Sequence, residues 1–378
     1  MKKIALNALI LNPHSGGLGI YLQQLICHFL QDAAGLDLRI FVNKKDAEDM
    51  LPSHGEQARI ENLPISSRNA PLRIFKETLK WPGILRGDHF DLFHSPMSYF
   101  PFVIPIPALL TVHDLRSFHM RESYSIARRK FLNQRIRDSV RKACHVIAIS
   151  EFTKDDLLEL FEIPAERISV IHEGIDKARF QMRAGEKQWQ EIRKRYQLPS
   201  RYILSVGHLE PRKNYINLLK AYALLRTGHA GVPPLVIVGQ ENWDFQPIYD
   251  HVWSLGLTGQ VLFTHFVEVR DLPAIYQRSL FFITASLYEG FGFTPLEAMA
   301  ADVPVAFAAA TSLPEIVGSA GLGFNPLDPE EMAKTMQMLV DDEDIRRALV
   351  LKGQENLKRF SWNRCCCNTL DLYHRITE

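Results

Sequence analysis

Short apolar runs that alternate with longer segments of helical periodicity most constrain the fold of this chain. In the first half the runs lie at Ile4–Leu11, Leu38–Val42, Leu109–His113, His145–Ser150 and Ile168–His172. In the second half they lie at Tyr202–Val206, Leu235–Val238, Val261–Phe263, Phe281–Ala285 and Val303–Phe307. Apolar runs of this length, each followed by a helical pattern, are typical of parallel strands covered on both faces. The alternation therefore predicts an α/β protein with two doubly wound domains.

The length of 378 residues also favours two domains, because a single hydrophobic core rarely organises so long a chain. A polar stretch at 184–195 separates the two sets of apolar runs, so the boundary is predicted between residues 178 and 198. The tail Phe360–Ile376 has helical spacing, and its apolar side chains are expected to dock on another element.

Charge and cysteine content narrow the class of protein. A net charge of +1 gives no case for nucleic acid as a partner. The five cysteines include no CxxC or Cys/His metal spacing, so we expect a reduced, cytoplasmic setting. The apolar start, interrupted by Asn7 and Pro13 and followed by no small-residue cleavage site, is interpreted as a strand rather than a signal peptide. No apolar run is long enough to span a bilayer, so any membrane contact is expected to be peripheral.

Arg212 and Lys213 follow the predicted strand Tyr202–Val206 and precede a helical segment, with Asn214 as the expected N-cap. Ligands of open parallel sheets collect at such strand ends, where helix N-termini favour anions. Two cations there would suit a diphosphate, since Arg forks onto phosphate oxygens and Lys acts as a point charge. The alternative is a solvated loop whose cations pair with Glu210.

A glycine turn, Gly290-Phe291-Gly292, follows the predicted strand Phe281–Ala285 and lies between Glu289 and Glu297. Glycines let the backbone approach a ligand closely, and carboxylates are good acceptors for sugar and ribose hydroxyls. The structural alternatives are an exposed loop acid at Glu289 and a capping box at Glu297, with Thr294 as N-cap.

The first half offers a second surface. The segment 14–19, which contains Gly16 and Gly17, follows the first strand and precedes a helical segment, although a tight turn explains the glycines equally well. His113 ends another strand, where it is a candidate for substrate contact, although a lone histidine is more often structural.

Taken together, these motifs resemble the retaining glycosyltransferases of family 4. The resemblance spans nearly the whole chain: Gly16–Gly19, Thr111–Asp114, Ile149–Thr153, His172–Asp176, Glu210–Asn214 and Glu289–Glu297. It implies the GT-B fold of two facing Rossmann-like domains. An acceptor-side domain would cover 1–182, with a helix at 360–378 crossing back to it, and a nucleotide-sugar donor domain would cover 183–359.

The resemblance also implies roles for individual residues. Arg212 and Lys213 would bind the donor pyrophosphate, and Glu297 the nucleotide ribose. Glu289 and the amides of Gly290–Gly292 would face the transferred sugar, and the amide region around Phe266 and Val267 the base. In the first domain His113 would lie near the anomeric centre, with Gly16 and Gly17 also on substrate. His208 stands where relatives often have a small or basic residue, so it receives no role.

The implied reaction is metal-independent transfer with retention of anomeric configuration, in which the two cations neutralise the departing diphosphate. The amino-acid sequence of Leu209–Asn214 is most similar to the corresponding segment of bacterial mannosyltransferases of polysaccharide assembly. This favours transfer of mannose from GDP-mannose to a glycan or lipid-linked saccharide. The alternatives are a UDP-sugar donor, a sugar-nucleotide epimerase and a non-catalytic binding module. The D-x-D pattern at Asp342–Asp344 lies in an acidic run and is interpreted as a solvated face.

A basic segment at 121–142 lies within a stretch, 59–142, that holds 15 Lys and Arg against 7 Asp and Glu. It predicts an amphipathic helix whose apolar side packs against the protein and whose cationic side is exposed to solvent. A solvated face explains most of these charges. The alternative is attraction to an anionic membrane surface or a lipid-linked acceptor, reinforced by the apolar loop Tyr99–Pro107.

Overall fold

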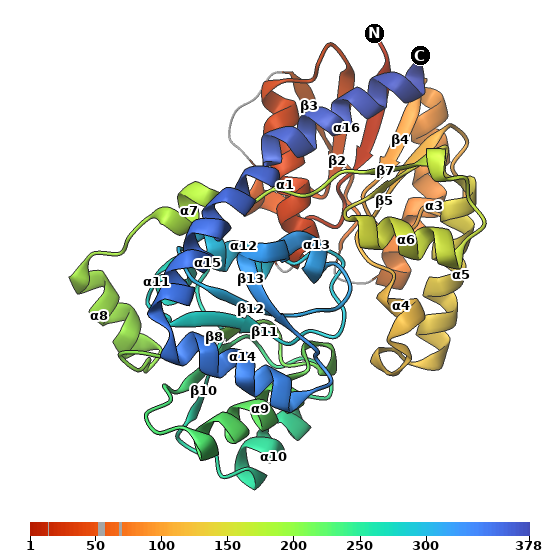
Figure 1. Ribbon diagram of the computed structural model, residues 1–378. Coiled ribbons are helices and arrows are strands. Elements are labelled where there is room, and N and C mark those ends of the chain that lie inside the picture. Colours follow the sequence, from red (N-terminus) through yellow and green to blue (C-terminus); the bar gives the residue numbers. More distant parts are fainter. Residues whose placement is uncertain (14, 52–56, 68–69) are drawn as a thin grey trace. The chain divides into compact units, whose positions relative to one another are not determined.

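The computed structural model describes residues 1–13, 15–51, 57–67 and 70–378 (Figure 1). The chain divides into two compact units, Met1–Gly174 together with Ser361–Glu378, and Ile175–Phe360. The predicted division at residues 182 and 183 lies further along the chain than this one.

Within the described residues, the first unit is built on a sheet of seven parallel strands in the order β3-β2-β1-β4-β5-β6-β7. The strands are β1 (Lys3–Asn7), β2 (Asp37–Val42), β3 (Ala58–Asn62), β4 (Leu92–Ser95), β5 (Ala108–Val112), β6 (His145–Ala148) and β7 (Ile168–Val170). Parallel neighbours need crossover connections, which the helices of this unit supply. The helices are α1 (Gly16–Gln31), α2 (Lys44–Ala47), α3 (Ala70–Gly87), α4 (Arg116–His119), α5 (Ile126–Lys142), α6 (Glu151–Leu160) and α16 (Trp362–Thr377).

Alternate residues of the central strand β1 enter two different cores. Ile4 and Leu6 belong to the cluster that also holds α1, whereas Ala5 belongs to the cluster on the other face. Because side chains of a strand point to opposite faces in turn, a strand buried on both faces is apolar throughout. This explains why the sequence presents these strands as continuous apolar runs.

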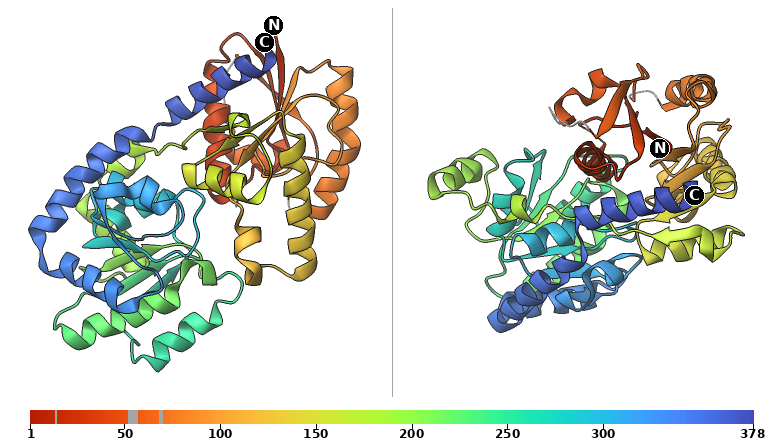
Figure 2. Two further views of the ribbon diagram at one scale, coloured as in Figure 1. Left: turned by 45° about the vertical axis from the view of Figure 1, so that its right-hand side comes forward. Right: turned by 90° about the horizontal axis from the view of Figure 1, so that it is seen from above.

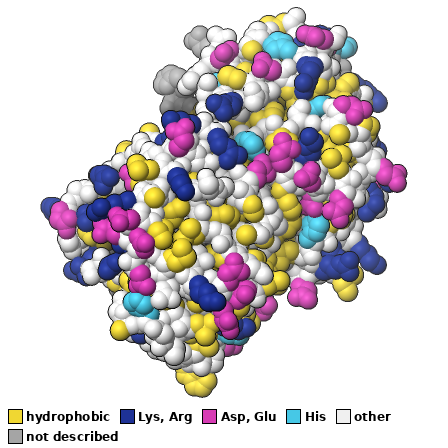
Figure 3. All heavy atoms as spheres, viewed as in Figure 1, with side chains coloured by type: hydrophobic (Ala, Val, Ile, Leu, Met, Phe, Trp, Pro, Cys, Tyr) yellow, Lys and Arg dark blue, Asp and Glu magenta, His cyan; other side chains and the backbone are white. Residues whose placement is uncertain are grey.

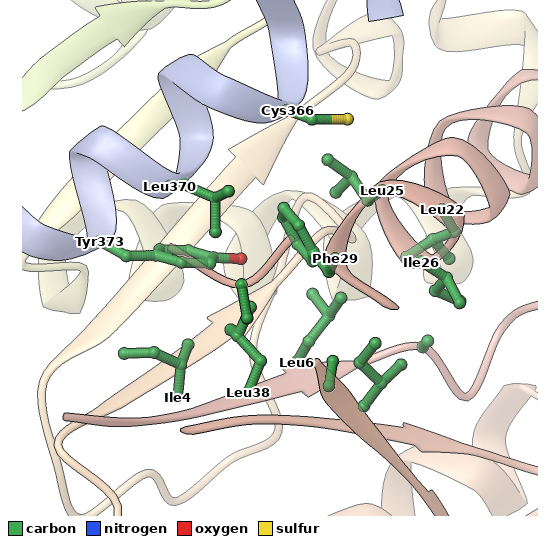
Figure 4. Packing of buried hydrophobic residues seen from close by; sticks show 14 of the residues in the cluster. Ile4, Leu6, Leu22, Leu25, Ile26, Phe29, Leu38, Cys366, Leu370 and Tyr373 are labelled. Atoms are coloured by element: carbon green, nitrogen blue, oxygen red, sulfur yellow. The ribbon is translucent and has the colours of Figure 1, made fainter. Parts of the chain in front are cut away.

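The C-terminal helix α16 packs against α1 over the first of these cores (Figure 4). Cys366, Leu370 and Tyr373 of α16 are buried with Leu25 and Phe29 of α1. Figures 1 and 2 show the two chain ends close together on this unit. The predicted helical tail that returns to the first domain is therefore confirmed.

In the described residues of the second unit, six parallel strands form a sheet in the order β10-β9-β8-β11-β12-β13. The strands are β8 (Ile203–Val206), β9 (Leu235–Val238), β10 (Val261–His265), β11 (Phe281–Thr284), β12 (Val305–Ala308) and β13 (Gly321–Phe324). The helices are α7 (Lys177–Gln181), α8 (Glu186–Arg195), α9 (Tyr215–Gly228), α10 (Gln246–Ser254), α11 (Leu272–Gln277), α12 (Phe293–Ala300), α13 (Leu313–Val317), α14 (Pro329–Asp341) and α15 (Glu343–Asn356). The predicted pair of doubly wound parallel sheets is confirmed.

The first strand is shorter than its apolar run suggests. The run continues to Leu11, but β1 ends at Asn7, whose side-chain Oδ1 accepts a hydrogen bond from the amide of Leu9. The following residues form a buried turn, in which the amide of Leu11 donates to the carbonyl of Ala8. Apolar character therefore marks burial here, and not continued pairing in the sheet.

Candidate active site

The loops after β8 and β11 meet at the carboxyl ends of two neighbouring strands of the second unit. The amide of Leu287 donates a 2.9 Å hydrogen bond to the carbonyl of Arg212, which ties one loop to the other. Arg212 and Lys213 lie in a short 3-10 turn, Pro211–Lys213, directly before α9. The fold thus brings together the two motifs that the sequence places 76 residues apart.

Glu289 lies between the two cations. Its Oε1 is 2.7 Å from Nζ of Lys213, and its Oε2 is 2.7 Å from Nη1 of Arg212. Nη2 of Arg212 is also 2.7 Å from Oε1 of Glu210, and Asn242 donates to the other oxygen of Glu210. We call Glu210, Arg212, Lys213 and Glu289 the ion cluster. Its formal charges cancel, so the cations are held in position before any anion arrives.

Burial and charge act in opposite directions on this cluster. Burial opposes ionisation of Glu289, but Arg212 and Lys213 outweigh it and lower the pKa of Glu289 to about 2. Burial lowers the pKa of the Lys213 ammonium, and the attraction of Glu289 offsets part of that effect. The carboxylate of Glu289 thus stays ionised and helps to keep Lys213 protonated.

Glu297 lies on α12, which begins directly after the glycine turn. Its Oε2 accepts a 2.8 Å hydrogen bond from the hydroxyl of Tyr276 on α11. Burial raises the pKa of Glu297, and the hydrogen bond from Tyr276 offsets part of that rise. A buried carboxylate with one defined donor keeps its remaining oxygen capacity for another partner.

In the first unit, His113 follows β5 and lies beside a buried carboxylate. Its Nδ1 is 3.3 Å from Oε1 of Glu173, whose side chain is 1% exposed. The ring of Tyr21, from α1, meets the His113 ring edge-on with centroids 4.9 Å apart. Gly16 and Gly17 open α1, and Gly16 has a φ of +56°, which favours glycine. His14, from the same predicted motif, lies outside the described residues.

Two family models match the chain. The model "Glycosyl transferases group 1" matches residues 188–356, and "Glycosyltransferase Family 4" matches residues 15–179. Escherichia coli O-antigen chain mannosyltransferase B is 30% identical over 75% of this chain and 74% of its own length. The chain belongs to glycosyltransferase family 4. It is accordingly a glycosyltransferase enzyme, as its motifs predicted.

Two further similarities place this family 4 enzyme among known proteins. The E. coli serotype-specific mannosyltransferase WbdA is 30% identical over 73% of the chain, which spans about a third of the length of WbdA. The structure of Anabaena HepE in complex with UDP-glucose has a TM-score of 0.75 at 19% identity and covers 99% of this chain and 100% of its own. The predicted GT-B class of α/β fold, with two Rossmann-like parallel-sheet domains, is therefore confirmed.

The glycine turn of this family 4 enzyme is held by a third loop, which the sequence analysis did not single out. Thr311 and Ser312 follow β12, the next strand along the sheet. Oγ1 of Thr311 accepts from the amide of Glu289, and the Ser312 hydroxyl contacts the carbonyls of Glu289 and Phe291. Hydroxyl residues just past a strand end were the available signal, but their partners lie more than 20 residues away.

Two local interpretations of this site are wrong, and a third is correct only in position. The capping box fails because α12 begins at Phe293, with Gly292 as its N-cap, so Glu297 is too far along the helix. Glu289 is not an exposed loop acid, since its side chain is 16% exposed and doubly paired. Asn214 is the N-cap residue of α9, as predicted, but its side chain does not cap the helix, because that amide donates instead to the carbonyls of Ala285 and Pro326.

The alternative in which the cations only pair with Glu210 is true in part. Arg212 does pair with Glu210, but both cations also pair with Glu289 on the other loop. Val267 follows β10 at the same edge of the sheet, two strands away from β8. The structure thus brings Arg212, Lys213 and Glu289 into contact, whereas Val267 lies apart from them, after β10.

The basic segment forms α5, and its apolar side packs only in part. Ile136 and Val140 are buried, whereas Ile126 and Phe131 are exposed. In Figure 3, Lys and Arg side chains gather at the lower right, where Figure 1 places the end of α5 near α4. Among the residues that the structure describes, no helix combines the length and the apolar character needed to cross a membrane.

Proposed function

We propose that this enzyme transfers mannose from GDP-mannose, with retention of anomeric configuration, to a glycan or lipid-linked saccharide during assembly of a bacterial surface polysaccharide. The observation that carries the proposal is the ion cluster, in which Lys213 and Arg212 each lie 2.7 Å from Glu289 at the carboxyl ends of β8 and β11. The names of the relatives, an O-antigen chain mannosyltransferase and a serotype-specific mannosyltransferase, support mannose as the sugar.

The proposed donor site follows the sheet edge. Arg212 and Lys213 would bind the pyrophosphate, because fixed cations neutralise charge without reorganising. Glu289 and the backbone amides of Gly290, Phe291 and Gly292 would hold the sugar, and Glu297 would accept a hydrogen bond from a ribose hydroxyl. The backbone at Val267 would contact the base. All of these groups follow strands β8, β10 or β11 at the carboxyl edge of the sheet, where open α/β folds bind ligands.

The proposed reaction exchanges one bond at the anomeric carbon for another. The bond between that carbon and the diphosphate oxygen breaks, and Arg212 and Lys213 neutralise the departing charge. The acceptor oxygen bonds to the same face, and its proton passes to the departing phosphate. In the first unit, His113 would contact the sugar near the anomeric carbon, and Gly16 and Gly17 would present backbone amides to the substrate.

A transfer assay tests the proposal directly. Purified enzyme is incubated with GDP-, UDP-, ADP- and dTDP-sugars, first alone in a thermal-shift panel and then with mannose-containing acceptors. We expect the largest rise in melting temperature with GDP-mannose, since a ligand of the folded state stabilises it. The product should carry an α-linked mannose. Interconversion of the donor without acceptor would indicate an epimerase, a larger shift with a UDP-sugar would change the donor, and no nucleotide response would refute the proposal.

If Arg212 neutralises the departing diphosphate, its removal should lower the rate of transfer. Arg212→Ala should lower kcat by roughly a hundredfold to a thousandfold, the usual effect of removing one such group. Lys220→Ala is the matched control, because Lys220 lies exposed on α9, seven residues after Lys213 of the cluster. Steady-state kinetics would contradict the role if both variants kept the wild-type kcat.

The proposal also includes a cytoplasmic enzyme in peripheral contact with the inner face of the cell membrane. The five cysteines are unpaired, which suits a reducing compartment. A lipid-linked acceptor would reside at that membrane, and the exposed cations of α5 would be attracted to anionic lipid. Fractionation of cells, with washes of rising salt, tests it: an electrostatic association is released by salt.

A further inference from the structure

Helix α3 (Ala70–Gly87) exposes a stripe of large apolar side chains. Leu72, Phe75 and Leu79 are 48%, 61% and 66% exposed. Their spacing of three and four residues puts them on one face of the helix. The opposite face is already used, because Ile74 and Trp81 are buried beneath the helix. The stripe is therefore in excess of what the fold needs.

The loop after β4 extends this stripe. Phe102 and Val103 are 46% and 49% exposed. The loop lies against α3, since the amide of Phe102 donates a 3.3 Å hydrogen bond to Oγ1 of Thr78. The ring of Phe102 is fixed from the other side by Arg135 of α5, whose guanidinium carbon lies 3.8 Å from the ring centroid. We call Leu72, Phe75, Leu79, Phe102 and Val103 the α3 patch.

The exposed charged side chains on α3 itself are all cationic. Lys76 and Lys80 are exposed one position after Phe75 and Leu79, so they flank the stripe along one side. The single acid within α3, Glu77, is 1% exposed and faces inward, where Oε1 lies 3.2 Å from Nε of Arg73. The exposed face of the helix thus carries apolar side chains and cations but no carboxylate.

We infer that the α3 patch docks on the surface of an anionic phospholipid bilayer. A helix that lies in a membrane interface buries an apolar stripe at the boundary between headgroups and acyl chains, while flanking lysines reach the phosphates. A second copy of the chain fits less well. A two-fold contact through this patch would bring the Lys76 and Lys80 side chains of both copies together, and like charges in an interface oppose binding.

This inference rests on the membrane contact proposed above and locates it. It differs from attraction to α5 alone, which predicts binding through charge without apolar insertion. The α3 patch predicts both a salt-sensitive part, from Lys76 and Lys80, and a salt-resistant part, from Phe75 and Leu79. The two surfaces can therefore be separated by substitution.

Vesicle co-sedimentation of the full chain, without any sugar donor, tests the inference. Vesicles of phosphatidylcholine alone are compared with vesicles in which a third of the lipid is phosphatidylglycerol. We expect wild-type enzyme to bind the anionic vesicles much more tightly than the neutral ones. Phe75→Ser with Leu79→Ser should weaken partitioning roughly tenfold or more. Lys76→Ala and Lys80→Ala should each weaken it about fivefold at low salt.

Two controls make the result specific. Leu351→Ser removes an apolar side chain that is 72% exposed on α15 of the second unit, and should leave binding unchanged. Circular dichroism and the thermal shift with the donor should match wild type in every variant, so that loss of binding is not loss of folding or of donor binding. Transfer to a soluble acceptor should also persist, which separates this inference from the proposed function.

Three outcomes would overturn the inference. Wild-type enzyme could fail to bind anionic vesicles at low salt. The serine double variant could bind as well as wild type, while reversing the charges of Arg128, Arg129 and Lys130 on α5 removes binding. Sedimentation velocity could show a dimer that the serine double variant abolishes, which would assign the α3 patch to a second copy of the chain.

Discussion

Glu289 is the residue on which the charge state of the ion cluster depends. It shares its two oxygens between Arg212 and Lys213, each at 2.7 Å. Because burial by itself lowers the pKa of Lys213, the carboxylate is what opposes loss of that proton. The residue that would face the sugar thus also maintains a cation for the diphosphate.

Replacing Glu289 by Gln should change how donor binding responds to pH. Without the carboxylate, the pKa of Lys213 falls further, so the ammonium loses its proton at a lower pH than in wild type. Affinity for the nucleotide diphosphate should then decline with rising pH, and the decline should begin at a lower pH in Glu289→Gln than in wild type. Calorimetric titrations at several pH values measure this, and parallel curves for the two proteins would contradict it.

The position of Glu173 in the first unit leads to a second prediction. Its carboxylate lies 3.3 Å from Nδ1 of His113, whose Nε2 has no hydrogen-bond partner among the described residues. We expect Glu173 to hold the imidazole so that Nε2 is presented to the sugar. Glu173→Gln, which keeps the shape and removes the charge, should lower kcat by about tenfold to a hundredfold with little change in KM.

A structural role alone would give a different pattern for Glu173. If the residue only stabilised the fold, Glu173→Gln would lower the melting temperature and leave kcat unchanged in the folded fraction. Glu159→Gln, which alters an exposed carboxylate of α6 outside the predicted motifs, is the matched control and should change neither quantity.

Strands with a continuous apolar run could be predicted from the sequence, whereas strands without such a run were missed. β9 was predicted with its observed bounds, Leu235–Val238. β4 (Leu92–Ser95) carries His94 and Ser95, and β13 (Gly321–Phe324) carries two glycines. Both are strands because of their neighbours in the sheet, and a local pattern does not contain those neighbours.

The same limit applies to the candidate site. Arg212, Lys213 and Glu289 were predicted because strand-to-helix turns in parallel sheets share one edge. The actual role of Asn214 was not, since its amide binds the carbonyls of Ala285 and Pro326, 71 and 112 residues away. Residue type and turn position could be predicted, whereas hydrogen-bond partners distant in the sequence could not.

The glycine at the start of α12 leads to a prediction about the stability of the second unit. Gly292 has a φ of +121°, and a Cβ added there would lie 2.8 Å from Cδ2 of Leu313. Gly292→Ala should therefore destabilise the second unit by about 1–3 kcal/mol. Gly228→Ala is the control, since nothing lies within 4 Å of its added Cβ and its position at the end of α9 favours Ala.

Thermal unfolding of both glycine variants, with and without donor, checks this. The melting temperature of Gly292→Ala should fall by several degrees, and the donor-induced shift should shrink because the turn carries Glu289 and leads into α12. Equal melting temperatures for the two variants would show that the turn adapts to a side chain without strain.

The first unit is built from two segments of the chain, Met1–Gly174 and Ser361–Glu378, that are separated in sequence by the whole second unit. The last helix, α16, follows the 186 residues of the second unit, Ile175–Phe360, yet its side chains complete the core of the first unit. Tyr373 is fully buried, and its hydroxyl lies 2.6 Å from Nδ1 of the buried His94. The first unit is thus complete only when the end of the chain is present.

Removal of Ser361–Glu378 should therefore unfold the first unit and spare the second. Loss of Leu370, Leu372 and Tyr373 removes buried apolar surface worth about 5–9 kcal/mol, at about 1.5–3 kcal/mol per side chain. That is comparable to the whole stability of a typical domain. The ion cluster lies entirely within Ile175–Phe360, so the truncated chain should still show a thermal shift with the donor but no transfer.

Hydrogen exchange followed by mass spectrometry measures the two units separately. In the truncated chain, amides of β1 and β2 should exchange near the unprotected rate, while those of β8 and β11 keep their protection. Asp371→Ala in the full chain, an exposed residue of α16, should leave both sheets protected. Protection of β1 in the truncated chain would contradict the prediction, because it would show that α16 covers a core that is already stable. The helix would then serve another purpose, such as positioning His94 through Tyr373.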